Sequence, residues 1–213
     1  MNAPDKSLLS KLYNNRELVP DHAQYFARWA EESQRARGTM ASHLDLRYGE
    51  APGETLDLFP ARKGDGSCMM FIHGGYWRSL DKRDFSFLAP TFDRQLPKDL
   101  WKGGLAISGL YDLRPLVDID WLNVDLRLDE ATALKVSPAF MSPATRAPVM
   151  TCVGADESSE FIRQNALLGE RWKSAFAGDI PAPGRHHFSV VDDLGEEQTA
   201  LFQGVRKLMK LDK

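Results

Sequence analysis

The sequence lacks several features that would place it in a specialised class of protein. It has only two cysteines, Cys68 and Cys152, and both lie in apolar runs, so we expect buried free thiols rather than a disulfide or a metal site. No apolar stretch approaches the length of a membrane span, and the polar N-terminal segment lacks the apolar core of a signal peptide. The net charge of -3 gives no reason to expect nucleic acid or a membrane as a partner. These absences predict a cytoplasmic protein.

A further absence concerns catalysis. The sequence contains no G-x-S-x-G, the motif that places a nucleophilic serine on a sharp turn between a strand and a helix. Yet it carries His73-Gly74-Gly75 directly after an apolar run at residues 68–72, which predicts a buried strand. A turn of this kind offers free backbone N–H groups to the negative charge that develops on a substrate oxygen. The sequence therefore predicts an oxyanion hole without the nucleophile that would use it.

Buried apolar segments alternate with helical patterns, which predicts an α/β fold with a mainly parallel sheet flanked by helices. A length of 213 residues favours a single domain spanning residues 1–213. We expect strands at residues 43–48 and 55–59, forming a hairpin, and at residues 68–72, 104–108, 148–153 and 189–191. We expect helices within residues 13–37, beginning near Asp21, and at residues 81–88, 160–177 and 193–211.

Three polar residues, His73, Ser108 and Asp156, follow predicted strands at their carboxyl ends, where the sites of parallel sheets gather. Asp156 precedes His187 in the acid-then-histidine order of hydrolase triads, in which the carboxylate fixes the tautomer of the imidazole. His186 competes for the same role, because neighbouring side chains point in different directions. In the alternative interpretation, Asp156 caps the following helix and both histidines lie at the surface. The upstream diglycine favours the catalytic interpretation.

Together these pieces resemble the α/β-hydrolase superfamily, and within it the kynurenine formamidase (arylformamidase) and esterase branch. The matching motifs are His73-Gly74-Gly75-Tyr76-Trp77, GLAISGLYD at 104–112, Ser137-Pro138, GADES at 154–158 with Glu160-Phe161, and His187-Phe188. The resemblance implies an oxyanion hole at His73, Gly74 and Gly75, with Asp156 as triad acid and His187 as base. It implies a small aryl formamide or ester as substrate and no cofactor, and it is compatible with a homodimer. No cluster of acids and histidines has the spacing of metal ligands.

The resemblance fails between Phe92 and Trp101. It implies a strand, a crossover helix and a second strand with the serine turn at this place, which needs about 30 residues, whereas the sequence supplies only residues 93–100. Ser108 lacks a glycine two positions before it, so we expect it to contact substrate or hold structure rather than to attack. Three explanations stay open: a segment missing from this sequence, a sheet that has closed over the gap and brought the strands of Phe71 and Leu105 together, or a degraded gene product that folds poorly.

Two functions follow from these observations. The first is a serine-type hydrolase of a formamide or ester that works through an acyl-enzyme, inactive in this chain because the nucleophile is missing. The second is a non-catalytic remnant that binds a small molecule or a partner subunit through an aromatic pocket of Tyr76, Trp77, Tyr111 and Trp121. Packing into the core is the alternative role of Trp77.

Overall fold

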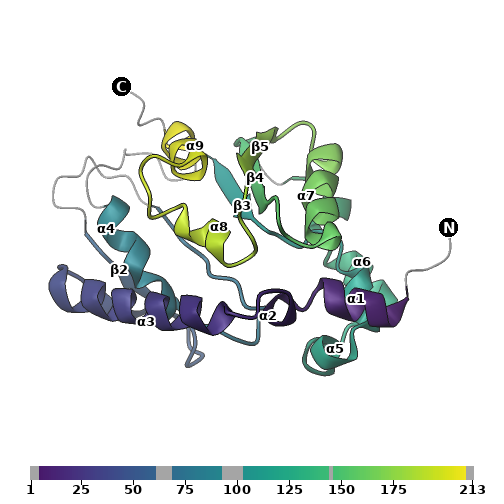
Figure 1. Ribbon diagram of the computed structural model, residues 1–213, viewed down its shortest axis with the longest axis horizontal. Coiled ribbons are helices and arrows are strands. Elements are labelled where there is room, and N and C mark those ends of the chain that lie inside the picture. The colour runs from purple at the N-terminus through teal and green to yellow at the C-terminus, as the bar shows by residue number, and fades with distance from the viewer. Residues whose placement is uncertain (1–4, 61–68, 93–102, 144–145, 210–213) are drawn as a thin grey trace.

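The computed structural model describes residues 5–60, 69–92, 103–143 and 146–209 of the chain (Figure 1). The strands are β1 (His43–Arg47), β2 (Thr55–Leu58), β3 (Gly104–Ile107), β4 (Val149–Gly154) and β5 (Phe176–Ala182). The α-helices are α1 (Lys6–Leu12), α2 (Asn15–Leu18), α3 (His22–Thr39), α4 (Ala89–Phe92), α5 (Asp120–Leu126), α6 (Glu130–Lys135), α7 (Ser159–Arg171), α8 (Ser189–Asp192) and α9 (Ala200–Leu208). Short 3-10 helices are η1 (Lys82–Leu88), η2 (Arg114–Asp118) and η3 (Pro138–Phe140).

The centre of the fold is a parallel sheet in the order β3-β4-β5. Neighbouring residues of β4 point to opposite faces of this sheet. Cys152 packs in a buried cluster with side chains of α8 and α9. The hydroxyl of Thr151 donates to Asp179, which also accepts from the Asn165 amide of α7. Helices therefore cover both faces, which confirms the predicted α/β fold with a parallel sheet and flanking helices.

Several predicted elements need correction. The predicted strand at residues 189–191 is instead the short helix α8, and the C-terminal helix begins only at Ala200. The predicted helix 160–177 ends at Arg171, and the strand β5 that follows was not expected. Its sequence contains Gly178, which has φ 133°, and Pro181, two residues that usually interrupt strands. Proline is tolerated in β5 because this strand lies at the edge of the sheet.

The described part of the predicted strand at residues 68–72 is not a strand. Cys68 lies outside the described residues, and residues 69–74 have no regular secondary structure. Met70 is 61% exposed and Ile72 is 81% exposed, so the apolar run is not buried as expected. Within the described residues β1 pairs only with β2, and β3 only with β4. The strands of Phe71 and Leu105 have therefore not come together, and within the described ranges the segment has no neighbouring strand to hold it.

β1 and β2 form the predicted hairpin, which stands apart from the central sheet (Figure 1). A buried carboxylate, Asp57 of β2, anchors it. This carboxylate accepts from Arg37 of α3, from Lys82 of η1 at 2.5 Å and from the Asp45 backbone N–H at 2.9 Å. The position of the hairpin therefore depends on charged hydrogen bonds more than on apolar packing.

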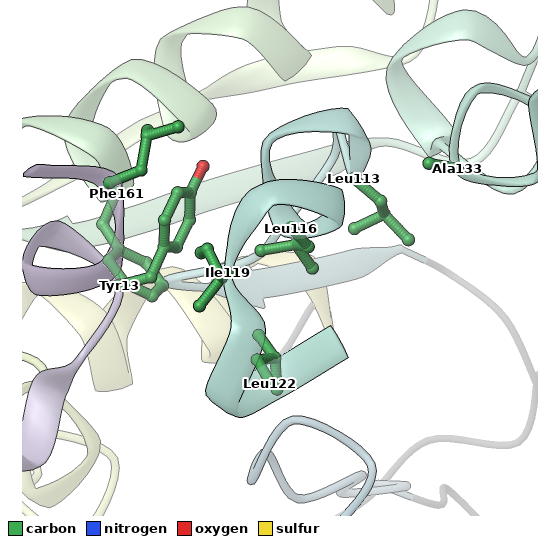
Figure 2. Packing of buried hydrophobic residues seen from close by; sticks show 8 residues of the cluster. Tyr13, Leu113, Leu116, Ile119, Leu122, Ala133 and Phe161 are labelled. Atoms are coloured by element: carbon green, nitrogen blue, oxygen red, sulfur yellow. The ribbon is translucent and has the colours of Figure 1, made fainter. Parts of the chain in front are cut away.

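A buried hydrophobic cluster joins the N-terminal segment to the region beside the sheet (Figure 2). Its members are Leu9, Tyr13, Leu113, Leu116, Ile119, Leu122, Ala133 and Phe161. The rings of Tyr13 and Phe161 meet edge to face, with centroids 5.7 Å apart. This contact ties the end of α1 to the start of α7. None of the described helices combines the length and the apolar character needed to cross a membrane.

Candidate active site

A cavity of about 1390 Å³ is lined by the segment around the diglycine and by part of the central sheet. Residues 69–80 line it, and so do residues 103–105 and 107–110. Phe161, His187 and Phe188 also line the cavity. The diglycine and His187 therefore line the same cavity, although they lie more than 100 residues apart in the sequence.

The carboxylate and the imidazole of the site are Glu157 and His187. Glu157 Oε2 accepts a hydrogen bond from His187 Nδ1 at 2.7 Å. The Glu157 side chain is fully buried, and its other oxygen accepts from the Ser108 hydroxyl at 2.5 Å and from the Gly154 N–H at 2.8 Å. Three donors offset the cost of burying this charge. The bond to Glu157 places a proton on Nδ1 and leaves Nε2 of His187 as the acceptor nitrogen.

The turn after β4 aims Glu157 inward. The Glu157 N–H donates to the Gly154 carbonyl at 3.1 Å, and the Asp156 N–H donates to the Arg185 carbonyl at 3.0 Å. A side chain at Gly154 would place its Cβ only 2.1 Å from the Arg185 carbonyl oxygen. Glycine is therefore required for the close approach of the loop that carries His187.

The described contacts give His187 a hydrogen bond to Glu157 and none to Asp156, contrary to the expectation that Asp156 pairs with His187. Asp156 is exposed, and the next residue, Glu157, provides the buried carboxylate. Successive side chains of a tight turn point in different directions, so motif position alone did not separate the two acids. The sequence signal for the second acid is its position directly after Asp156 in the GADES motif.

The choice between the two histidines follows from their contacts. His186 Nε2 lies 3.0 Å from the Tyr25 hydroxyl, and its ring meets the Tyr25 ring at 5.0 Å. His187 faces Glu157 and packs 4.6 Å from the Phe161 ring. Of these two neighbouring histidines, His187 lines the cavity and His186 does not.

The diglycine forms the sharp turn that the sequence predicts. Gly75 has φ 113°, and its carbonyl accepts from the N–H groups of Arg78 and Ser79 at 3.1 and 3.0 Å. Within the described residues, the N–H groups of Gly74 and Gly75 make no hydrogen bond, and both glycines line the cavity. His73 does not face Glu157: its Nδ1 lies 2.7 Å from the Gly74 carbonyl, and its ring stacks on Phe85.

Three of the four aromatic residues predicted for the pocket line the cavity. Tyr76 and Trp121 meet edge to face at 6.0 Å, and the Tyr76 hydroxyl donates to the Tyr13 carbonyl at 2.7 Å. Burial raises the pKa of Tyr76 well above its ordinary value, so the phenol stays a neutral donor. Trp77 is 72% exposed at the cavity wall, which argues against the alternative of core packing. Tyr111 is buried in another cluster, with Ala139 and Leu168.

The chain is similar to known proteins over most of its length. It is 23% identical to a kynurenine formamidase of Salmo salar, with 84% of this chain and 86% of that protein covered. It is 24% identical to a kynurenine formamidase of Danio rerio, with coverage of 83% and 85%. A solved structure described as a candidate thioesterase of a Silicibacter species superposes with a TM-score of 0.81 at 24% identity, covering 92% and 97%. No protein-family model matches the chain.

These similarities support the kynurenine formamidase and esterase branch of the α/β-hydrolases.

The alignments with the kynurenine formamidases are longer than this chain. Each extends over 255 positions, whereas this chain has 213 residues. An alignment longer than the chain requires the relatives to carry residues, within the matched span, that have no counterpart here. The gap expected at residues 93–100 lies outside the described residues.

Neither Ser108 nor Cys152 is placed to act as a nucleophile beside His187. The Ser108 hydroxyl donates to Glu157 and not to His187, and it lies in a buried position with φ 49°. Cys152 is buried and free, and burial raises the pKa of its thiol to about 12, so it carries almost no thiolate at neutral pH. Among the described residues, no three histidine, cysteine or acidic side chains gather closely enough to hold a metal ion.

Proposed function

We propose that the site belongs to a hydrolase of formamides or esters and that this chain carries the acid–base half of it. The observation that supports this most is the 2.7 Å bond between Glu157 and His187 beside the cavity that the diglycine also lines. In such a site, His187 Nε2 takes the proton of an attacking hydroxyl and later gives it to the leaving amine or alcohol. Glu157 holds the ring and stabilises the imidazolium formed between the two steps.

The unbonded N–H groups of Gly74 and Gly75 suit the oxyanion hole of this reaction. They line the same cavity as His187, and the Gly75 turn fixes their direction. Donors held in place before the reaction stabilise the developing oxyanion without reorganisation, and one such donor is typically worth about 10²–10³-fold in kcat.

We propose a small aryl formamide or ester as substrate. Two observations support this class: the named activity of the kynurenine formamidases to which the chain is similar, and the cavity wall formed by Tyr76, Trp77 and Trp121. Aromatic rings of this kind stack on an aryl group.

Among the described residues no serine hydroxyl bonds His187, and the sequence contains no G-x-S-x-G turn. Without that turn, we expect only water to attack the carbonyl. Loss of the serine from a triad lowers kcat by about 10⁶-fold. We therefore expect no acyl-enzyme and almost no turnover from the 213-residue chain.

The test restores the missing part. A strand, helix and strand ending in G-x-S-x-G is inserted between Phe92 and Trp101, and hydrolysis of an activated aryl ester and of an N-formyl aryl amine is followed. We expect a burst of product from the insertion variant and none from the original chain. Two matched controls, the inserted serine changed to alanine and His187→Ala, should abolish the burst while leaving the circular dichroism spectrum unchanged. A folded insertion variant without activity would contradict the proposal.

A second candidate is a non-catalytic protein that binds an aryl compound. The commitment of the Ser108 hydroxyl to Glu157 and the exposed Trp77 at the cavity favour it. This candidate predicts that an aryl formamide quenches tryptophan fluorescence and that Trp77→Ala removes the quenching. It also predicts that the insertion variant shows no turnover.

A further inference from the structure

The serine at the end of β3 has its hydroxyl committed to the buried acid. Ser108 directly follows Ile107, the last residue of β3, and Gly154 is the last residue of the neighbouring strand β4. The Ser108 hydroxyl and the Gly154 N–H both donate to Glu157 Oε1, at 2.5 and 2.8 Å. The ends of two adjacent strands therefore hold the same carboxylate oxygen.

The second oxygen of this carboxylate meets the imidazole. Glu157 Oε2 accepts from His187 Nδ1 at 2.7 Å, and the Glu157 side chain is fully buried. A glutamate side chain has several rotatable bonds, and holding them in one arrangement costs conformational entropy. A carboxylate is also planar and rigid, so two donors on Oε1 restrict where Oε2 lies. The contacts at Oε1 therefore help to determine the contact that Oε2 makes with His187.

The backbone of Ser108 is turned in a way that suits this contact. Its φ is 49°, in the left-handed region that residues with a Cβ seldom adopt. Rotation about the N–Cα bond takes the side chain out of the alternation of a regular strand. The Ser108 N–H still donates to the Cys152 carbonyl at 2.8 Å, so the residue stays bonded to β4 while its hydroxyl reaches Glu157. Such conformations persist only where surrounding contacts fix them, and they gather at functional sites.

The bond from Ser108 to Glu157 belongs to the strong class. A hydroxyl and an ionised carboxylate form hydrogen bonds of about 2.5–2.7 Å, and this one measures 2.5 Å. Among the described contacts, loss of the hydroxyl would leave Oε1 with the Gly154 N–H as its donor. A buried charge that loses a donor is destabilised, so the carboxylate would shift or admit water.

We propose that Ser108 is a positioning residue, whose hydroxyl sets the direction of Glu157 and thereby fixes the tautomer of the His187 ring. With Nδ1 protonated, Nε2 is the acceptor nitrogen that the acid–base chemistry needs. Ser108 then acts through Glu157, and neither attacks the substrate nor binds it. The part of this inference that concerns turnover rests on the proposed function.

The first test uses the full-length chain and needs no activity. Nitrogen NMR of isotope-labelled histidine distinguishes the two neutral tautomers, because a ring nitrogen with a proton and one without resonate far apart. At a pH where the ring is neutral, we expect His187 to carry its proton on Nδ1. Ser108→Gly should speed exchange of this proton with water by about tenfold or more, and both tautomers should then be populated.

The choice of variants separates the hydroxyl from the backbone. Glycine accepts a φ of 49° without strain, so Ser108→Gly removes the hydroxyl and relaxes the turn, whereas Ser108→Ala removes the hydroxyl and keeps the strain. Both should change the His187 signal alike. Ser158→Ala is the matched control, because its hydroxyl donates to the Leu12 carbonyl at 2.6 Å and should not affect His187. Amide exchange in β4 shows whether each variant is folded. An unchanged tautomer in folded Ser108→Gly would overturn the inference.

The second test measures aryl ester turnover in the insertion variant. Ser108→Gly should lower kcat by about 10- to 100-fold, as expected for loss of one hydrogen bond to a charged group, and should change KM by less than about twofold. In a Glu157→Gln background the same change should have almost no further effect, because the residue through which Ser108 acts is already altered. Additive losses would indicate a merely structural role, and a raised KM at unchanged kcat would indicate substrate contact. Either result would overturn the inference.

The two tests can fail separately. A changed tautomer in Ser108→Gly, with a kcat loss that depends on Glu157, supports both the positioning role and the proposed function. A changed tautomer without turnover from the folded insertion variant supports the positioning role and contradicts the proposed function. Turnover from the insertion variant with an unchanged tautomer in Ser108→Gly supports the proposed function and overturns the positioning role.

Discussion

Apolar side chains have opposite degrees of burial in the central sheet and in residues 69–74. Ile180 in β5 is 4% exposed, whereas Ile72 in the segment after Met69 is 81% exposed. Cys152 in β4 is fully buried, whereas Met70 is 61% exposed. The difference lies in their neighbours: β4 has a strand on each side and β5 has one, whereas residues 69–74 have none in the part of the chain that the structure describes. An apolar sequence becomes a buried strand only where an adjacent edge and a covering helix are available.

The same contrast divides the site. The Glu157–His187 pair lies on loops that leave the complete β4 and β5 strands, and each partner has defined contacts. The diglycine lies on the incomplete side, where its turn is held by its own bonds to Arg78 and Ser79 and by the Tyr76 hydroxyl. In terms of the proposed function, the Glu157–His187 side is the built, acid–base half, and the diglycine side is the open half, which would receive the nucleophile.

The largest expected effect tests the built half. In the insertion variant, Glu157→Gln should lower kcat by about 10⁴-fold, because an amide no longer fixes the imidazole tautomer or stabilises its cation. Asp156→Asn is the matched control and should change kcat by less than about twofold, since its side chain is exposed. Steady-state kinetics on an aryl ester measures both. The opposite ranking would return the role of triad acid to Asp156.

The next effect compares the two isoleucines directly. Ile180→Ala should lower the free energy of unfolding by about 2–5 kcal/mol, because it leaves a cavity against α9 beside Gly204. Ile72→Ala should change it by no more than about 0.5 kcal/mol. Urea unfolding of both variants gives the two values. A large loss from Ile72→Ala would mean that the segment is buried in solution.

Many elements of the fold could be predicted from local sequence patterns. The strands β3 and β4 were predicted from short buried apolar runs bounded by turn residues, and α3 and α7 from their helical periodicity. β5 was missed because Gly178 and Pro181 disguise it, and only its position at the edge of the sheet makes them acceptable. Residues 68–72 were predicted as a strand for a sound local reason, but a strand also needs a partner, which a local pattern does not reveal.

The sequence predicted which motifs line the site, but not which of their side chains point into it. His187 and the diglycine were named from the sequence, and they line one cavity. The choice of Glu157 over Asp156 depends on the turn formed by the Glu157 N–H and the Gly154 carbonyl, and the packing against Arg185 fixes it. The direction of each side chain arises from tertiary contacts, which cannot be inferred from the spacing of motifs.

A smaller effect concerns the open half. Gly75→Ala should disturb the turn, because its φ of 113° suits glycine and an added Cβ would lie 1.9 Å from the Ser79 carbonyl oxygen. A strain of about 1–3 kcal/mol would speed amide exchange at Arg78 and Ser79 by about 5- to 150-fold. Gly74→Ala is the matched control, because an added Cβ has no neighbour within 4 Å. Equal exchange in both variants would show that the turn is not formed as described.

The smallest effect concerns the pH dependence of the hairpin. Burial alone would raise the pKa of Asp57, but hydrogen bonds from the Asp45 N–H, Lys82 and Arg37 together hold it below the ordinary value. A lowered pKa in the folded state contributes stability above the ordinary value of about 4, and this contribution is lost as the pH falls through the folded value.

We therefore expect the β1–β2 amides to exchange faster below about pH 4, after correction for the intrinsic exchange rate. The expected loss in the free energy of opening the hairpin is on the order of 1 kcal/mol. The β4 amides should be less affected. Asp57→Asn should remove most of this acid dependence and weaken the hairpin at neutral pH, because an uncharged amide cannot replace the bonds from Lys82 and Arg37. An unchanged acid profile in Asp57→Asn would mean that other carboxylates anchor the hairpin. The hairpin would then depend on contacts beyond this single buried charge.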